Sequence, residues 1–213
     1  MTVRGGIAKY PIMRSLILLT MLIAIGAAPA PDALAQGEPA AKPAAPPANP
    51  DSGRRATLDD LFKRLAEAKD ETEAKGVVNL IERRWSRSGS DTADLLMTRA
   101  GEALKGKEFP LAIELLDRVL TLQPDWAEAW NRRATAFFLL DDPVSAMADM
   151  RQVLQREPRH FGAWAALGHM YMSNGDKKRA LEAYRKALAL FPRFEMVRTI
   201  VERLAPEIDG RDI

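Results

Sequence analysis

Apolar side chains after residue 56 recur at the three- and four-residue intervals that are typical of amphipathic helices. Within residues 161–194 they form two stripes, which are Trp164, Gly168 and Tyr171, followed by Ala180, Tyr184 and Ala187. An Asn-Gly-Asp turn at 174–176 separates the stripes, and Pro192 ends the second. Because neither helix can bury its stripe alone, the pattern predicts two helices packed against each other, with small residues where the backbones approach.

This helix pair recurs along the chain with a fixed period. The residues that keep a spacing of 34 are Pro124, Pro158 and Pro192, then Ala112, Ala146 and Ala180, and also Trp130 and Trp164. A fixed period of this size is the signature of a helical repeat array. The spacing therefore predicts three consecutive helix pairs, over 93–126, 127–160 and 161–194.

These positions resemble the tetratricopeptide repeat. Residues 161–194 carry W-x2-L-G-x2-Y, then A-x3-Y-x2-A, then proline. The unit 127–160 departs at Arg133, where leucine is usual, and the unit 93–126 departs at Arg99 and Ala103. The resemblance implies an all-α fold, in which a tetratricopeptide domain over 57–205 forms a right-handed superhelix of helix-turn-helix repeats.

Helical segments are also predicted on either side of the three repeats. Residues 57–92 read as a helix pair, but Ser90 stands where the repeats have proline. We interpret this pair as a degenerate first repeat or an N-terminal cap. Residues 195–205 predict a C-terminal capping helix with a polar outer side, and residues 206–213 predict a flexible tail.

The first 35 residues have the pattern of an export signal. Basic residues up to Arg14 precede an apolar run over 16–28, and Ala33-Leu34-Ala35 follows it. As a helix the run rises only ~20 Å, less than the ~30 Å hydrocarbon core, so cleavage after Ala35 is favoured over a retained membrane anchor. Met13 is an alternative start. Residues 36–56 predict an Ala/Pro-rich disordered linker, or a strap for a groove.

The order of these segments resembles that of small exported tetratricopeptide proteins of Gram-negative bacteria. That resemblance implies a periplasmic location, with no stable membrane anchor after cleavage. Basic and acidic residues are equal in number after residue 35, so no basic surface for nucleic acid is predicted.

Few residues suggest catalysis or metal binding. The chain has no cysteine, which excludes disulfides and thiolate metal sites. Its only histidines are His160 and His169, and no carboxylate stands three or four residues from His169. Glycine-rich phosphate loops and serine nucleophile elbows are missing from the sequence. We therefore expect a protein that is not an enzyme and has no cofactor or metal.

A superhelix of this kind has a concave face lined by the first helix of each pair. The positions that are expected to line it, numbered 2, 5, 6, 9 and 12 of each repeat, supply Asp94, Met97, Leu104, Glu128, Asn131, Arg132, Thr135, Phe138, His169 and Met172. This mixed surface predicts a groove for a peptide or protein partner. Two alternatives stay open: these residues have no ligand, or a second copy of the chain fills the groove or the end face of a homo-oligomer.

Three arginines refine the expected chemistry of the groove and of the repeats. Tetratricopeptide domains that bind chaperone C-termini place lysine, asparagine and arginine at positions occupied here by Met97, Gly101, Arg132, Gly162 and Ala166. Only Arg132 fits, so capture of a terminal carboxylate is disfavoured. Arg99 and Arg133 replace leucine at position 7, and we expect them to pair with Asp117 and Asp149, or else to contact an acidic ligand.

Overall fold

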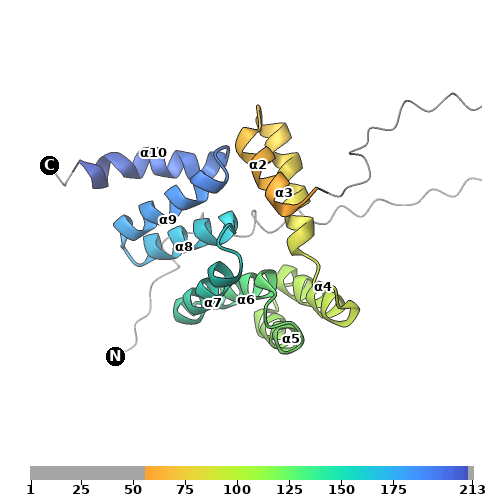
Figure 1. Cartoon of the computed structure of the whole chain (residues 1–213). Coiled ribbons are helices and arrows are strands. Elements are labelled where there is room, and N and C mark those ends of the chain that lie inside the picture. The colour runs from red at the N-terminus through yellow and green to blue at the C-terminus, as the bar shows by residue number, and fades with distance from the viewer. Residues whose placement is uncertain (1–55, 211–213) are drawn as a thin grey trace, which may run out of the picture.

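The computed structural model describes residues 56–210, in which all regular elements are helices. The predicted export signal, nearly all of the linker and the last three residues lie outside this range. Three successive pairs form a row (Figure 1), namely α4 (Asp91–Lys105) with α5 (Phe109–Leu122), α6 (Ala127–Leu139) with α7 (Pro143–Arg156), and α8 (Phe161–Ser173) with α9 (Lys177–Leu190). Before them come α2 (Leu58–Glu67) and α3 (Glu71–Trp85), and after them α10 (Glu195–Asp209). The all-α prediction is confirmed.

Packing within a pair depends on the small residues of the repeat. A Cβ atom at Gly168 would lie only 2.4 Å from Cε1 of Tyr184, so the ring of Tyr184 occupies the space of the missing side chain. Trp130 and Trp164 are half-buried, and their indole N–H groups donate to the carbonyl oxygens of Pro124 at 2.8 Å and Pro158 at 3.0 Å. Each tryptophan thus fixes the loop that enters its own helix pair.

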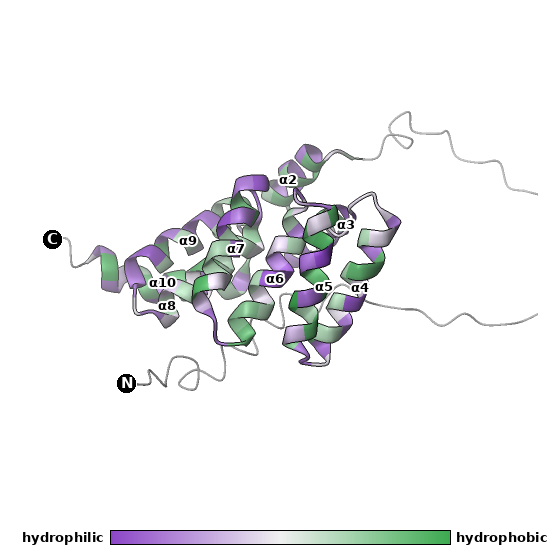
Figure 2. Cartoon of the chain, turned by 90° about the horizontal axis from the view of Figure 1, so that it is seen from below, coloured by the Kyte–Doolittle hydropathy of each residue, from purple (hydrophilic) through white to green (hydrophobic). Residues whose placement is uncertain are grey.

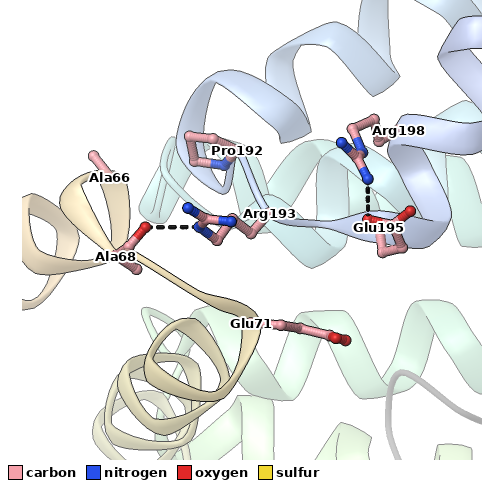
Figure 3. A pocket seen from close by; sticks show the side chains of 7 residues that line it. All are labelled: Ala66, Ala68, Glu71, Pro192, Arg193, Glu195 and Arg198. Carbon is pink, nitrogen blue, oxygen red and sulfur yellow. Dashed lines mark hydrogen bonds and ion pairs between the residues drawn. The ribbon is translucent and has the colours of Figure 1, made fainter.

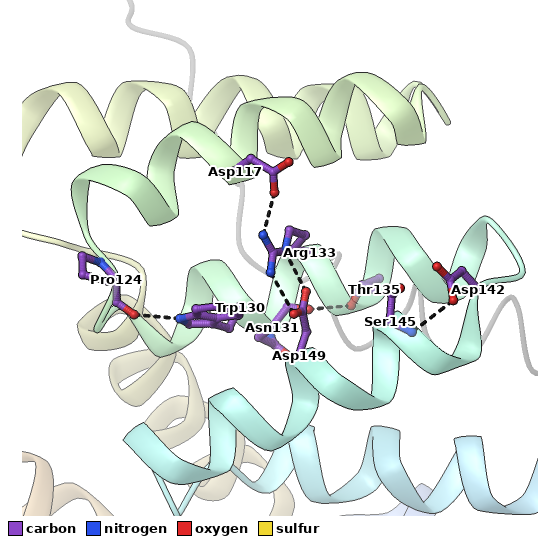
Figure 4. Close-up of polar contacts among 9 residues, drawn as sticks. All are labelled: Asp117, Pro124, Trp130, Asn131, Arg133, Thr135, Asp142, Ser145 and Asp149. Atoms are coloured by element: carbon purple, nitrogen blue, oxygen red, sulfur yellow. Dashed lines mark hydrogen bonds and ion pairs between the residues drawn. The ribbon is translucent and has the colours of Figure 1, made fainter.

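Arg133 makes the ion pairs expected of a charged group at a leucine position (Figure 4). Its guanidinium donates from Nε and Nη2 to both carboxylate oxygens of Asp149, at 2.8 and 2.9 Å, and from Nη1 to Asp117 at 2.6 Å. One side chain therefore joins α6 to its own partner α7 and to the preceding α5. Arg99 differs, because it is exposed and has no ion pair within residues 56–210.

The α2–α3 pair does not stack on α4, so it does not continue the row as a degenerate first repeat would. The connection after α3 contains Gly89, whose φ of +83° is in the left-handed region. One, two and three periods later, Gln123, Glu157 and Phe191 have φ of −137°, −134° and −133°. Ser90 caps α4 by accepting from the amide of Ala93. These two differences direct α3 away from the stacking position on α4.

Instead, α2–α3 lies across the N-terminal ends of α6, α8 and α10 (Figure 1). We call these three helix ends the rim. Trp126 at the start of α6 donates to the carbonyl of Trp85 at 2.6 Å, and His160 at the start of α8 stacks on the Trp85 ring at 4.3 Å. Apolar residues of α2 and α3 share a core with Phe161 and Phe194 of the rim and with Phe191 at the end of α9. The residues of α2 and α3 in this core include Leu61, Leu65, Val77 and Ile81.

Two arginines one period apart fix α2 at both of its ends. Arg159 binds Asp59 in the first turn, at 2.5 Å, and Arg193 donates to the carbonyls of Ala68, at 2.6 Å, and Lys69 just beyond the last turn. Exposed carbonyls at a helix C-terminus attract cations, so the second contact also suits the helix dipole.

Helix α10 covers the far side of α9, as expected for a capping helix, but it is longer than predicted. It continues past residue 205 to Asp209, so most of the predicted flexible tail that is described is helical. Glu207 and Asp209 form ion pairs with Lys177 and Arg185 of α9, both at 2.5 Å. These contacts hold the last turn in spite of Pro206, which removes one backbone hydrogen bond.

Candidate protein-binding groove

Most of the residues predicted to line the groove are buried in the repeat array. Exposure is below 10% for six of the ten, which are Met97, Leu104, Asn131, Thr135, Phe138 and His169. Met97 packs in one cluster with Trp126 and Ala129, and Phe138 in another with Ala163 and Leu167. The prediction fails for these six because their stripe packs against neighbouring helices of the array and does not face solvent.

His169 shows the difference most clearly. Its Nδ1 lies 2.9 Å from the hydroxyl of Tyr184 on α9, and 5% of the residue is exposed. Burial lowers the pKa of His169 to about 4, so the ring is neutral at physiological pH. This histidine is a hydrogen-bonded core residue and is not a groove contact.

Four predicted groove residues keep access to solvent, namely Asp94, Glu128, Arg132 and Met172. Further accessible side chains stand beside them at positions 6 and 13 of the first helices, and these are Thr98, Lys105, Ala166 and Ser173. A helical wheel places those positions next to 2 and 9, so the sequence contained the signal. The accessible groove is therefore narrower and more polar than predicted.

Arg132 lies at the centre of this groove. It donates from Nε to Glu128 at 2.9 Å, and its Nη1 would lie 3.0 Å from a Cβ atom at Gly101 on α4. Glu128 also accepts from the side-chain amide Nδ2 of Asn131 at 3.0 Å. Burial alone would raise the pKa of Glu128, but the imidazole of His160 and the guanidinium of Arg132 outweigh it and lower the pKa to about 2. The pair is thus a fixed, charged contact.

The end of α3 closes one side of the same groove. Burial and, to a lesser extent, the charge of Glu128 raise the pKa of Glu82 to about 7. The Nε2 atom of His160 lies 3.5 Å from Glu128, and it has no hydrogen-bond partner within residues 56–210, nor has the indole Nε1 of Trp85. The contact between α3 and the groove therefore leaves these two buried ring nitrogens without hydrogen-bond partners among the described residues. The groove is open toward the C-terminal ends of the first helices.

A separate hollow of about 310 Å³ lies between the α2–α3 turn and the α9–α10 turn (Figure 3). Its charged groups are already engaged, since Arg193 binds the Ala68 carbonyl and Arg198 binds Glu195 at 2.5 Å. This hollow is a gap beside the rim contacts and offers no free recognition group.

Within residues 56–210, His, Asp and Glu side chains do not gather into a set that would hold a metal ion. The described helices also include none that is long and apolar enough to cross a membrane.

Comparison with known sequences agrees with the period and the packing. Sequence profiles of the tetratricopeptide repeat match residues 97–151 and 162–194. A TPR repeat-containing protein of Rhizobium etli is 36% identical over 162 residues, which are 76% of this chain and 79% of that protein. The chain belongs to the tetratricopeptide repeat (TPR) family. The small glutamine-rich TPR-containing protein 2 of Mycosarcoma maydis is 29% identical over 106 residues, and this chain spans 30% of its length.

Solved TPR structures share the fold. The first TPR domain of Spaghetti (RPAP3), solved with the HSP90 peptide SRMEEVD, has a TM-score of 0.53 and 18% identity, over 56% of this chain and 95% of that chain. MamA has a TM-score of 0.52 and 21% identity, over 74% of this chain and 87% of that chain. At these identities the likeness concerns the stacked helix pairs alone.

Proposed function

We propose that this TPR protein is a non-enzymatic adaptor or scaffold of the cell envelope, which binds a segment of a partner protein in its groove. The observation that carries the proposal is Arg132, which is half-buried in the groove and lies opposite Gly101, where a side chain is lacking. A guanidinium fixed through Nε to Glu128 keeps further N–H donors for the carbonyl oxygens of an extended peptide.

The peptide class follows from the charges around Arg132. The TPR domain of Spaghetti was solved with an acidic HSP90 peptide. In this chain Glu128 already neutralises Arg132, and no other cation stands at the positions expected to hold a terminal carboxylate. We therefore favour an internal, uncharged segment over an acidic C-terminus.

In-cell crosslinking tests the groove. A photoreactive residue at Ala166, half-buried at position 6 of α8, is expected to capture one partner, and a second substitution, Arg132→Ala, is expected to reduce the yield. Phe138 is unsuitable, because it is 3% exposed. The control places the same photoreactive group at Glu182, exposed on α9. Equal capture of that protein from Glu182 would refute the groove assignment.

The envelope location rests on the pattern of residues 1–35. We expect the mature protein to begin at Gln36 and to be released with the periplasmic fraction. N-terminal sequencing of the purified protein and osmotic-shock fractionation measure both properties. A chain that keeps residue 1 and stays in the cytosol would contradict export but would leave the groove untouched.

A further inference from the structure

The outer face of the first repeat is uncovered, although the equivalent faces of the next two repeats are buried. Position 3 is Leu95 in α4, and this side chain is 54% exposed. One and two periods later, Ala129 and Ala163 are both fully buried. The second helix of the preceding pair packs against this position, since Ala129 shares a core cluster with residues of α5 and Ala163 with residues of α7. On α4 that place is empty within residues 56–210, since α3 lies at the rim.

Other positions of the same face show the same contrast. Glu102 at position 10 is exposed, whereas Ala136 and Met170 at the equivalent positions are 0% and 1% exposed. The neighbouring α5 adds Leu111 and Leu122, which are 43% and 48% exposed. Figure 2 shows the hydrophobic segments of α4 and α5 at this end of the row. We call the surface formed by Leu95, Arg99, Glu102, Leu111 and Leu122 the open face.

We propose that the open face binds the open face of a second copy of this chain about a two-fold axis. Arg99 and Glu102 have opposite charges one helical turn apart, and neither forms an ion pair within residues 56–210. In a two-fold interface each surface meets itself, so an axis between these residues places Arg99 against the partner's Glu102, and Glu102 against the partner's Arg99. The exposed leucines then become buried around two ion pairs.

Other occupants fit this surface less well. The opposite end of a second copy presents α10, whose outer residues Arg198, Glu202 and Arg203 are exposed and polar, so head-to-tail stacking would place charges against leucines. The chain's own α2–α3 pair is retained at the rim, since Trp126 binds Trp85 at the end of α3 and Arg159 binds Asp59 of α2. If the α4 helices of the two copies packed in parallel, Arg99 would lie against the partner's Arg99.

A charge-exchange experiment tests the two-fold arrangement. The mature protein is studied by light scattering over a concentration series, and its dimer dissociation constant is measured. Arg99→Glu and Glu102→Arg, made singly, are each expected to raise this constant at least about tenfold, because like charges then meet across the axis. The double variant R99E/E102R is expected to restore it, since both new pairs are again opposite. Circular dichroism checks that the helix content is unchanged.

Three outcomes of this experiment would contradict the proposed dimer. A wild-type chain that stays monomeric at ~100 µM overturns the proposal, since its dissociation constant would be too high for a stable dimer. A dimer that neither single variant weakens places the interface elsewhere. A double variant as weak as the singles overturns the two-fold geometry. Crosslinking from Ala166 in the groove is independent of these outcomes, so dimer formation and partner binding can fail separately.

Discussion

Gly168 shows how one missing side chain determines the packing of a helix pair. A Cβ atom there would lie 2.4 Å from the Tyr184 ring, whose hydroxyl is fixed by His169. We expect Gly168→Ala to destabilise the fold by about 1–3 kcal/mol, although alanine favours helix. Urea unfolding measures this free energy. Gly162→Ala in the same helix is the control, because the nearest side-chain atom would be 3.4 Å away, and its stability should not fall.

Arg133 gives a second residue-scale prediction. Its removal leaves Asp149, which is 5% exposed, without a counter-charge. We expect Arg133→Ala to cost about 3–5 kcal/mol, as measured by urea unfolding. Arg118→Ala removes an arginine whose pair with Glu114 is exposed, at 63% and 61%, and should cost less than about 1 kcal/mol. Similar losses in the two variants would show that the buried ion pairs of Arg133 contribute no more to stability than an exposed ion pair does.

At the scale of elements, the period of 34 was enough to predict the three helix pairs, because proline, tryptophan and alanine recur at fixed positions. The direction of α2–α3 was not predictable, since it depends on the φ angle of Gly89, and a glycine permits either sign. The groove was predicted only in part. Periodicity assigns Met97 and Phe138 to a stripe, but contacts between helices decide which side of that stripe is covered.

Gly89 therefore offers a test of the turn that separates α3 from α4. No atom lies within 4 Å of a Cβ built there, so alanine meets only the backbone cost of a φ of +83°. We expect Gly89→Ala to destabilise the fold by about 1 kcal/mol in urea unfolding.

Gly76 provides the matched control, because it lies inside α3, is exposed and also has no atom within 4 Å of a built Cβ. Gly76→Ala should stabilise the fold by about 0.5–1 kcal/mol through helix propensity. A gain in stability from both variants would contradict the strained turn.

For the whole molecule, α2–α3 connects parts of the chain that a simple repeat row keeps apart. Arg159 contacts Asp59 and Arg193 contacts Ala68, at sequence separations of 100 and 125 residues. The rim contact thereby links the start of the domain to its third repeat. One unfavourable part of this contact is the charge of Glu128 acting on the buried carboxyl of Glu82 in α3. The stability of the rim contact should therefore depend on pH.

The sign of that dependence follows from the pKa of Glu82, which burial raises from 4.5 to about 7. Between these values the folded chain holds a proton that the unfolded chain has lost, so stability decreases as pH rises through this window. Glu82→Gln keeps the neutral form. We expect this variant to be more stable than the wild type by about 1–3 kcal/mol at pH 8 and by much less at pH 5, as measured by urea unfolding at both values.

Glu67→Gln is the matched control, since Glu67 is exposed at the end of α2 and faces no buried carboxylate. That variant should keep the wild-type difference in stability between pH 5 and pH 8. If Glu82→Gln kept the same difference, the Glu82–Glu128 contact would not be the source of the pH dependence. If it removed the difference, deprotonation of Glu82 beside Glu128 would account for the loss of stability above neutral pH.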